Sequence, residues 1–211
     1  MNSKYLFVCL VFFCFANNLE ARLYFIHVPK TGGTTLRLLL ELQVAAEEIY
    51  PFRNIMHPTG PLTSDHQLIS GHLPYSFCKQ LDPRFKEAFT ITVLRDPVER
   101  YLSFLRAKKK ADPNLTHLES VIRLRHSKNN PFGDGLIDNA LCRYLAASPR
   151  LEGNLLLESA KQTLQELDCV IFFDQFTEDV LALFHRLGIH LDENEIPRIN
   201  ITEKEPVSEK L

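Results

Sequence analysis

A loop with two adjacent glycines is the first place in this sequence where residue types and spacing could do chemistry. It lies between a short apolar run and a helical pattern. Glycine lets a backbone approach a ligand closely, and the first N–H groups of a helix have no acceptor inside the helix. Backbone N–H groups, threonine hydroxyls and a lysine charge together suit a phosphate group. These predicted phosphate ligands are Lys30, Thr31, Gly32, Gly33, Thr34 and Thr35.

The order of residues separates this loop from the Walker A loop of nucleotide kinases and ATPases. In Walker A the lysine follows the glycines, whereas here Lys30 precedes Gly32 and Gly33. A nucleotide phosphate would therefore bind at a different position relative to the lysine and the glycines than in Walker A. A glycine-rich turn without a ligand is the structural alternative, but the lysine before the glycines and the threonines after them favour a ligand. A magnesium-dependent nucleotide kinase remains a second functional alternative.

Strand and helix patterns alternate along the chain. Short apolar runs predict buried strands at 23–28, 67–70, 89–94 and 169–173. Helical spacing follows the glycine loop as far as Val44, and returns at 97–105, 115–124, 136–147, 155–167 and 176–187. Such alternation predicts an α/β, P-loop-like three-layer fold, with a central parallel sheet flanked by helices. The glycine loop would then lie at the carboxyl end of a strand, where such folds bind ligands.

Length and composition fit one globular domain. The chain has 211 residues, of which 45% are hydrophobic and 24% are charged. Residues 1–21 have the layout of a signal peptide or a short membrane-anchoring leader, although an additional buried segment is the alternative. We expect the main domain at 22–190 and a polar, acidic, loosely packed tail at 191–211.

The charge is unevenly distributed along the chain. The formal net charge is only -2, which argues against binding of nucleic acid through overall charge. Nine lysines and arginines nevertheless lie between Arg95 and Lys128, where they could attract an anionic ligand or form a solvated helix face. Cys78, Cys142 and Cys169 lack the spacing of a zinc site and are interpreted as buried thiols.

Two motifs resemble those of a known enzyme family. The segment Phe25–Leu36 (FIHVPKTGGTTL) resembles the 5′-phosphosulfate-binding loop of carbohydrate sulfotransferases related to heparan sulfate 2-O- and 6-O-sulfotransferases. The segment Thr92–Phe104 (TVLRDPVERYLSF) is similar to the 3′-phosphate-binding segment of that family. Residues 138–145 and 172–187 are similar to later family segments, so the resemblance covers most of 23–187. It implies sulfonate transfer from PAPS (3′-phosphoadenosine 5′-phosphosulfate) to a carbohydrate hydroxyl.

The resemblance also implies roles for individual residues. Lys30 would be catalytic, since charge develops on the leaving 5′-phosphate. Arg95 and Ser103 would bind the 3′-phosphate, and His72 would be the catalytic base. Support of the substrate or nucleotide pocket would come from Asn139 and Arg143, while the charge of Arg106 would suit an anionic sugar chain. His57 and His66 are rival bases, and His27 is interpreted as a buried strand residue. No metal is expected.

The expected partners and location follow from the same observations. The acceptor would be a carbohydrate, and the basic residues would suit an anionic one. The leader would direct the protein to the secretory pathway or Golgi lumen, or associate it with a membrane; without a leader the protein would be cytoplasmic. Family members usually continue into a C-terminal helix, whereas this chain stops at Leu211, so a truncated C-terminus is expected. A catalytically weak protein that binds PAPS or a glycan is therefore a further alternative.

Overall fold

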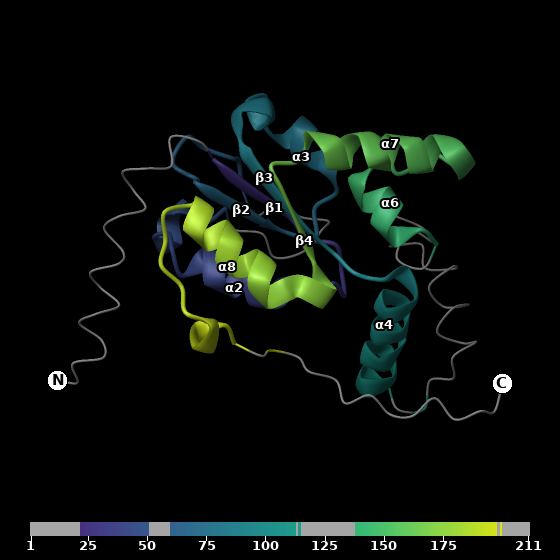
Figure 1. Cartoon of the computed structure of the whole chain (residues 1–211). Coiled ribbons are helices and arrows are strands. Elements are labelled where there is room, and N and C mark those ends of the chain that lie inside the picture. The colour runs from purple at the N-terminus through teal and green to yellow at the C-terminus, as the bar shows by residue number, and fades with distance from the viewer. Residues whose placement is uncertain (1–21, 51–59, 113, 115–137, 198, 200–211) are drawn as a thin grey trace.

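A computed structural model of the chain describes residues 22–50, 60–112, 114, 138–197 and 199. In these residues, four strands form one parallel sheet in the order β2-β1-β3-β4 (Figure 1). The strands are β1 (Leu23–Ile26), β2 (Leu68–Gly71), β3 (Phe89–Leu94) and β4 (Cys169–Phe172). Since all four run the same way, their carboxyl ends meet at one edge, and the predicted fold class is confirmed.

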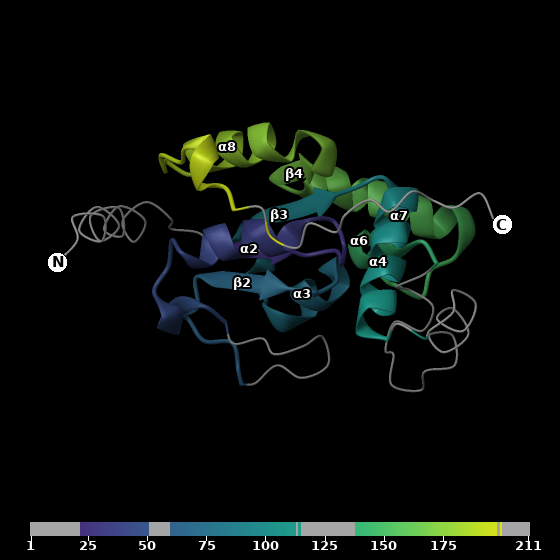
Figure 2. The ribbon, with the colours of Figure 1, turned by 90° about the horizontal axis from the view of Figure 1, so that it is seen from below.

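Helices cover both faces of the sheet. One face carries α2 (Gly33–Glu41) and α8 (Phe176–Arg186), while the other carries α3 (Tyr75–Leu81), α6 (Ala140–Leu145) and α7 (Gly153–Glu166). Figure 2 shows α8 and α3 on opposite sides of the strands. The helix α4 (Pro97–Ala111) follows β3 and extends beyond the carboxyl edge (Figure 1). Short 3₁₀ turns are η1 (Ala46–Glu48), η2 (Phe85–Glu87), η4 (Phe173–Gln175) and η5 (Glu193–Glu195).

The central strand β1 divides its side chains between two apolar cores. Leu23 and Phe25 pack with α2 and α8, whereas Tyr24 and Ile26 pack with α3, α6 and α7. Successive side chains of a strand point to opposite faces, so a strand covered on both faces is apolar throughout. This explains why β1 reads as a continuous apolar run and why all four of its residues are buried.

Several element boundaries differ from the sequence prediction. The helix α2 ends at Glu41 rather than near Val44, and α6 is shorter than the predicted 136–147. The helix α3 was not predicted, because it has only seven residues and buries only Tyr75 and Cys78. The packed core extends beyond residue 190, since Leu191 and Ile196 are partly buried against the α2/α8 side.

Some predictions lie outside the described residues. They concern the leader at 1–21, the helix at 115–124, the rival base His57, the basic residues Arg123, Arg125 and Lys128, and the tail beyond 199. Within the part of the chain that the structure describes, no helix has the length and hydrophobicity needed to cross a membrane. The three described cysteines are free thiols, of which Cys78 is buried and the other two are half-buried.

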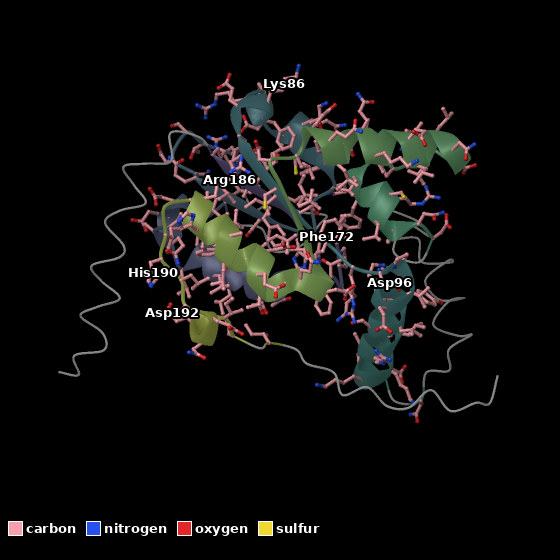
Figure 3. The ribbon with its side chains drawn as sticks, viewed as in Figure 1. Lys86, Asp96, Phe172, Arg186, His190 and Asp192 are labelled. Carbon is pink, nitrogen blue, oxygen red and sulfur yellow. The ribbon has the colours of Figure 1, made fainter. Side chains whose placement is uncertain are left out.

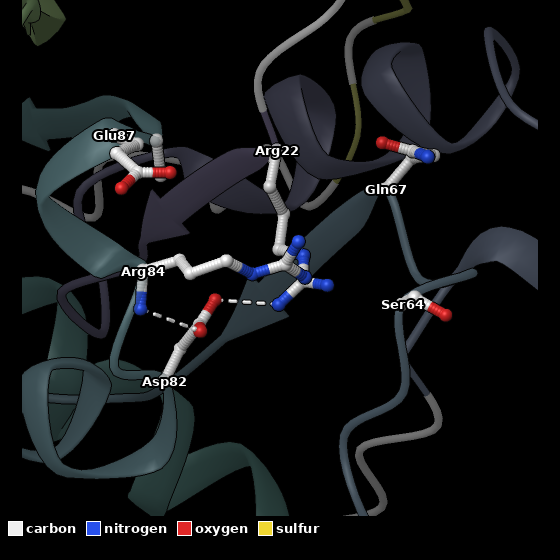
Figure 4. A pocket seen from close by; sticks show the side chains of 7 residues that line it. Arg22, Ser64, Gln67, Asp82, Arg84 and Glu87 are labelled. Carbon is white, nitrogen blue, oxygen red and sulfur yellow. Dashed lines mark hydrogen bonds and ion pairs between the residues drawn. The ribbon is translucent and has the colours of Figure 1, made fainter.

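A buried polar cluster lies at the amino-terminal edge of the sheet, beside a surface pocket (Figure 4). Arg22 Nη1 lies 2.5 Å from Asp82 Oδ2, and the Tyr24 hydroxyl donates to the same oxygen at 3.0 Å. The Arg84 N–H donates to Asp82 Oδ1 at 2.9 Å. Burial alone would raise the pKa of Asp82, but these three donors together hold that pKa below its usual value. The cluster joins the start of β1 to the loop after α3.

Replacing the buried Asp82 by alanine should lower the free energy of unfolding by about 3–5 kcal/mol, because it leaves the Arg22 guanidinium, whose side chain is only 9% exposed, without its carboxylate. The Asp82 pKa is lower in the folded protein, so its stabilisation is present above about pH 4 and is lost as the pH falls through the folded-state pKa. Urea denaturation at several pH values measures both effects.

The matched control is Glu158→Ala, which breaks an exposed ion pair with Lys161 and should change stability by at most about 1 kcal/mol. An equally small effect of Asp82→Ala would contradict a stabilising role for the cluster.

Candidate anion-binding and catalytic site

The residues that follow the four strands gather at the carboxyl edge of the sheet. Ile26, the last residue of β1, is aligned with Gly71 in β2 and with Thr92 in β3. The glycine loop therefore lies between His72, which follows β2, and Arg95, which follows β3. Figure 3 labels Asp96 and Phe172, which mark the corresponding ends of β3 and β4.

The loop after β1 has an unusual backbone. Lys30 has φ 71° and Gly32 has φ 87°, so a non-glycine residue and a glycine both adopt the left-handed conformation. For lysine this conformation costs free energy, and such strain persists only where the surroundings enforce it. The fully buried Thr31 hydroxyl donates to the Val28 carbonyl at 2.8 Å and closes the turn. A Cβ atom at Gly32 would lie 2.7 Å from the Phe173 ring, so this position also lacks space for a side chain.

Gly33 begins α2 and is in close contact with β1. A Cβ atom at Gly33 would lie 2.4 Å from Cδ2 of His27 and 2.7 Å from Cζ of Phe25. Real Cβ atoms do not approach that closely, so any larger residue would push the helix away from the strand end. The absence of a side chain therefore brings the positive end of the α2 dipole against the loop.

The threonines of the loop divide into two groups. Thr34 is exposed at the start of α2, where its hydroxyl and N–H group can reach a ligand. The Thr35 hydroxyl donates to the Pro197 carbonyl at 3.2 Å, and the Thr35 N–H donates to the Gly32 carbonyl at 3.2 Å. In this structure the Thr31 and Thr35 hydroxyls therefore hold the loop in shape, and their predicted contact with a phosphate group remains a prediction.

Lys30 and Arg95 bring two positive charges together. Burial, and then the nearby Arg95 guanidinium, lower the pKa of Lys30. The Arg95 side chain is only 14% exposed and lies 3.3 Å from the Glu99 carboxylate. Its guanidinium carbon lies 4.2 Å from the centre of the Phe173 ring. Among the described residues, its buried Nε has no hydrogen-bond partner. Glu99 is an ion-pair partner of Arg95, and the interaction of the two positive charges favours binding of an anion between them.

The start of α4 fixes the position of Arg95. Asp96 caps the helix by accepting the Glu99 N–H at 2.9 Å, and Pro97 occupies the first turn. Ser103 is buried two turns along the helix from Arg95, and the half-buried Arg106 lies one turn further. The sequence therefore predicted correctly that Arg95 lies at the carboxyl edge beside the loop, whereas the ligand roles of Arg95 and Ser103 remain predictions.

His72 lies beside the loop with its ring against the ring of His27. The two ring centres are 4.5 Å apart. Burial, followed by the Arg37 and Lys30 charges, lowers the pKa of His72 to about 4. Arg37 on α2 is in turn bound by Glu41, whose Oε1 lies 2.5 Å from the Arg37 Nε. His72 is therefore a neutral imidazole at physiological pH and can accept a proton.

The remaining predicted site residues lie in other surroundings. Arg143 bonds to Asp138 and to the carbonyls of Pro149 and Leu151, all within 138–151. Asn139 is exposed at the amino end of α6 and donates to Asp138 at 2.9 Å. These contacts fix the ends of α6, and the pocket role of both residues stays a prediction.

His66, the rival base, bonds to Thr63 before β2 begins. It therefore lies at the opposite edge of the sheet from His72.

Three neighbours of the site were not assigned to it from the sequence. Arg37 could have been found, because Gly33, Arg37 and Glu41 recur every four residues on one helix face. Phe173 and the contacts of His27 had no such signal, because they depend on packing between distant segments. Among the described residues, no group of three or more His, Cys, Asp or Glu side chains is arranged to hold a metal ion.

A parallel α/β sheet with a glycine loop and two cations at its carboxyl edge is the arrangement typical of proteins that bind a phosphate-bearing ligand. The sequence matches the Sulfotransferase family over residues 15–205, and the chain belongs to that family. Among curated proteins, none matches this sequence.

Two solved structures are similar in part. Mouse sulfotransferase SULT7A1, whose structure is a complex with PAP, is 16% identical, with a TM-score of 0.46 over 83% of this chain and 61% of that one. A sulfotransferase from Alicyclobacillus acidocaldarius is 13% identical, with a TM-score of 0.45 over 87% of this chain and 86% of that one.

We expect His72 of the free protein to titrate with a pKa of about 4. NMR of the imidazole Cε1–H group across a pH series measures it, with the His72→Asn spectrum providing the assignment. Arg37→Gln removes one of the two cations and should raise the His72 pKa. A wild-type His72 that titrated near its ordinary value of about 6.5 would contradict the buried, cation-rich surroundings.

Proposed function

We propose that this protein transfers a sulfonate group from PAPS to a hydroxyl of a carbohydrate acceptor. The observation that carries the proposal is the close approach of Lys30 and Arg95 at neighbouring strand ends, beside the amino terminus of α2. PAPS has phosphate groups at both the 5′ and the 3′ positions of one adenosine. Two adjacent cationic positions therefore suit this donor better than a nucleotide with a single phosphate-bearing position.

The loop and Lys30 would bind the 5′-phosphosulfate. In the reaction, the acceptor oxygen forms a bond to sulfur while the bond between sulfur and the 5′-phosphate oxygen breaks. Negative charge then grows on the leaving phosphate of PAP. Lys30, the α2 dipole and the first N–H groups of α2 stabilise that charge electrostatically. The binding of an anion would also restore the Lys30 pKa toward its usual value.

His72 would take the proton of the acceptor hydroxyl. Its pKa in the free protein is about 4, which makes it neutral but weakly basic. The charges that depress this pKa come from Arg37 and Lys30, so an anionic donor bound at Lys30 offsets part of them. Donor binding would therefore raise the His72 pKa and make His72 a stronger base only when PAPS is in place.

The carbohydrate acceptor is the finer part of the proposal. It is supported by the resemblance of the two nucleotide-binding motifs to those of glycan sulfotransferases. The half-buried Arg106 lies beyond Ser103 on α4. Three consecutive lysines, Lys108–Lys110, lie in the last turn of this helix. These residues extend the positive charge away from Arg95, which would suit an anionic sugar chain.

The function is tested by transfer from PAPS labelled in its sulfonate group to a panel of neutral and anionic oligosaccharides. Lys30→Ala should lower the transfer rate by about 10²–10³, the usual cost of losing a group that stabilises transition-state charge. The control is Lys161→Ala, at an exposed lysine of α7, which should leave the transfer rate unchanged. Near-normal turnover by Lys30→Ala would remove its role at the leaving group. Binding of PAP without transfer to any acceptor would favour the catalytically weak binding protein.

Arg95→Gln should reduce the preference for PAP over 5′-AMP by about 10- to 100-fold, since a charge-assisted hydrogen bond contributes about 1.5–3 kcal/mol. Isothermal titration calorimetry with each nucleotide measures the ratio, and ATP is included to test the nucleotide-kinase alternative. Arg150→Gln, at an exposed arginine between α6 and α7, should leave the ratio unchanged. An unchanged ratio in Arg95→Gln would place the 3′-phosphate elsewhere.

A further inference from the structure

The backbone places His27 and His72 side by side. They directly follow Ile26 and Gly71, which are paired at the ends of β1 and β2. The His27 N–H donates to the Gly71 carbonyl at 3.1 Å, and the Leu73 N–H donates to the same oxygen at 2.7 Å. One carbonyl oxygen thus extends the strand pairing by a residue and forms the tight turn that carries His72.

The His27 ring is held between three groups. It stacks on the Phe25 ring, with centres 5.1 Å apart and planes 11° apart. The His72 ring contacts it with a centre-to-centre distance of 4.5 Å and a tilt of 58°. The Cδ2 and Nε2 atoms of His27 lie against Gly33, where an added Cβ would come within 2.4 and 2.5 Å of them. Since the residue is only 6% exposed, the ring has little freedom to move independently of these neighbours.

We propose that His27 is a positioning residue whose ring transmits the position of the donor-binding loop to His72 and keeps the His72 ring buried. The inference rests on the proposed function, in which the loop binds the donor and His72 is the base. His27 acts through His72 and the loop, and it is not itself assigned a proton-transfer step. The contact also gives a reason for glycine at position 33, because a side chain there would displace the His27 ring.

The role of His27 is steric rather than electrostatic. Burial, and then the nearby His72, Arg37 and Lys30, lower the pKa of His27 well below its ordinary value, so its ring is neutral. The charges that face His72 come from Arg37 on α2 and Lys30 in the loop, and Glu41 binds Arg37 from the same helix. Glu41 also accepts the Ser70 hydroxyl of β2 at 3.4 Å. A neutral ring of similar size at position 27 should therefore keep His72 buried and its pKa low, whereas a small side chain should not.

The test compares His27→Ala with His27→Phe by NMR titration of the His72 Cε1–H group. Removal of the His27 ring admits water to His72, so the His72 pKa should rise from about 4 toward its ordinary value of about 6.5 in His27→Ala. In His27→Phe it should stay near about 4, because phenylalanine keeps the ring contact and the burial. The control is His66→Ala, which removes a histidine from the opposite edge of the sheet and should leave the His72 titration unchanged.

A second readout uses the best acceptor of the oligosaccharide panel. His27→Ala should lose activity as the pH falls from neutral toward acidic values, because His72 is then protonated. The profiles of wild type and His27→Phe should fall at a lower pH than that of His27→Ala, because their His72 pKa starts lower before the donor raises it. Burial lowers the pKa of both histidines, so folding stability itself decreases as the pH falls, and the folded fraction is therefore measured by circular dichroism at each pH and the activity is divided by it.

The two proposals can fail separately. An unmoved His72 pKa in folded His27→Ala, or equal shifts in the alanine and phenylalanine variants, would overturn the positioning role. If His27→Ala does not fold, His27→Asn is read in the same way, because it too removes the ring. The expected shift in a protein that binds no PAP by calorimetry would support the His27 contact and overturn the proposed function. Normal PAP binding with an unmoved His72 pKa in His27→Ala would overturn the positioning role of His27 and leave the proposed function intact.

Discussion

The pairing of β1 with β2 on one side and with β3 on the other determines where the functional groups lie. Because the three strands are parallel and aligned at Ile26, the residues that follow them must share one edge. The backbone therefore places Lys30 near Arg95 on one side and His27 beside His72 on the other. Arg37 on α2 adds a third cation to Lys30 and Arg95. The packing of the whole sheet and its helices opposes the mutual repulsion of these three charges.

Electrostatic repulsion at this edge connects the structure to the proposed chemistry. A site that lowers the pKa of Lys30 and holds His72 near a pKa of about 4 is one in which positive charge is in excess. An anionic donor relieves that excess, and the pKa values of both groups then rise together. Glu99 and Glu41 each bind one arginine, and so orient the guanidinium groups of Arg95 and Arg37.

Sequence patterns predicted the parts of the structure that depend on neighbouring residues. The apolar runs, the glycine loop and the position of Arg95 at the end of β3 are local features, and the rule for parallel strands brings them to one edge. Packing between distant segments carries no such signal. The Thr35 bond to Pro197 joins residues 162 positions apart, and Phe173 lies against Gly32 although the two residues are far apart in the sequence. His27 was correctly interpreted as buried, but its contact with His72 depends on strand register that composition does not specify.

A crystal structure of the complex with PAP tests most directly whether the two cationic positions bind the two ends of one nucleotide. We expect the 5′-phosphate within hydrogen-bonding distance, about 2.7–3.2 Å, of Lys30 Nζ and of the first N–H groups of α2. The 3′-phosphate should contact the Arg95 guanidinium, next to Ser103. A nucleotide bound with its 3′-phosphate away from Arg95, or bound outside the carboxyl edge of the sheet, would contradict this expectation.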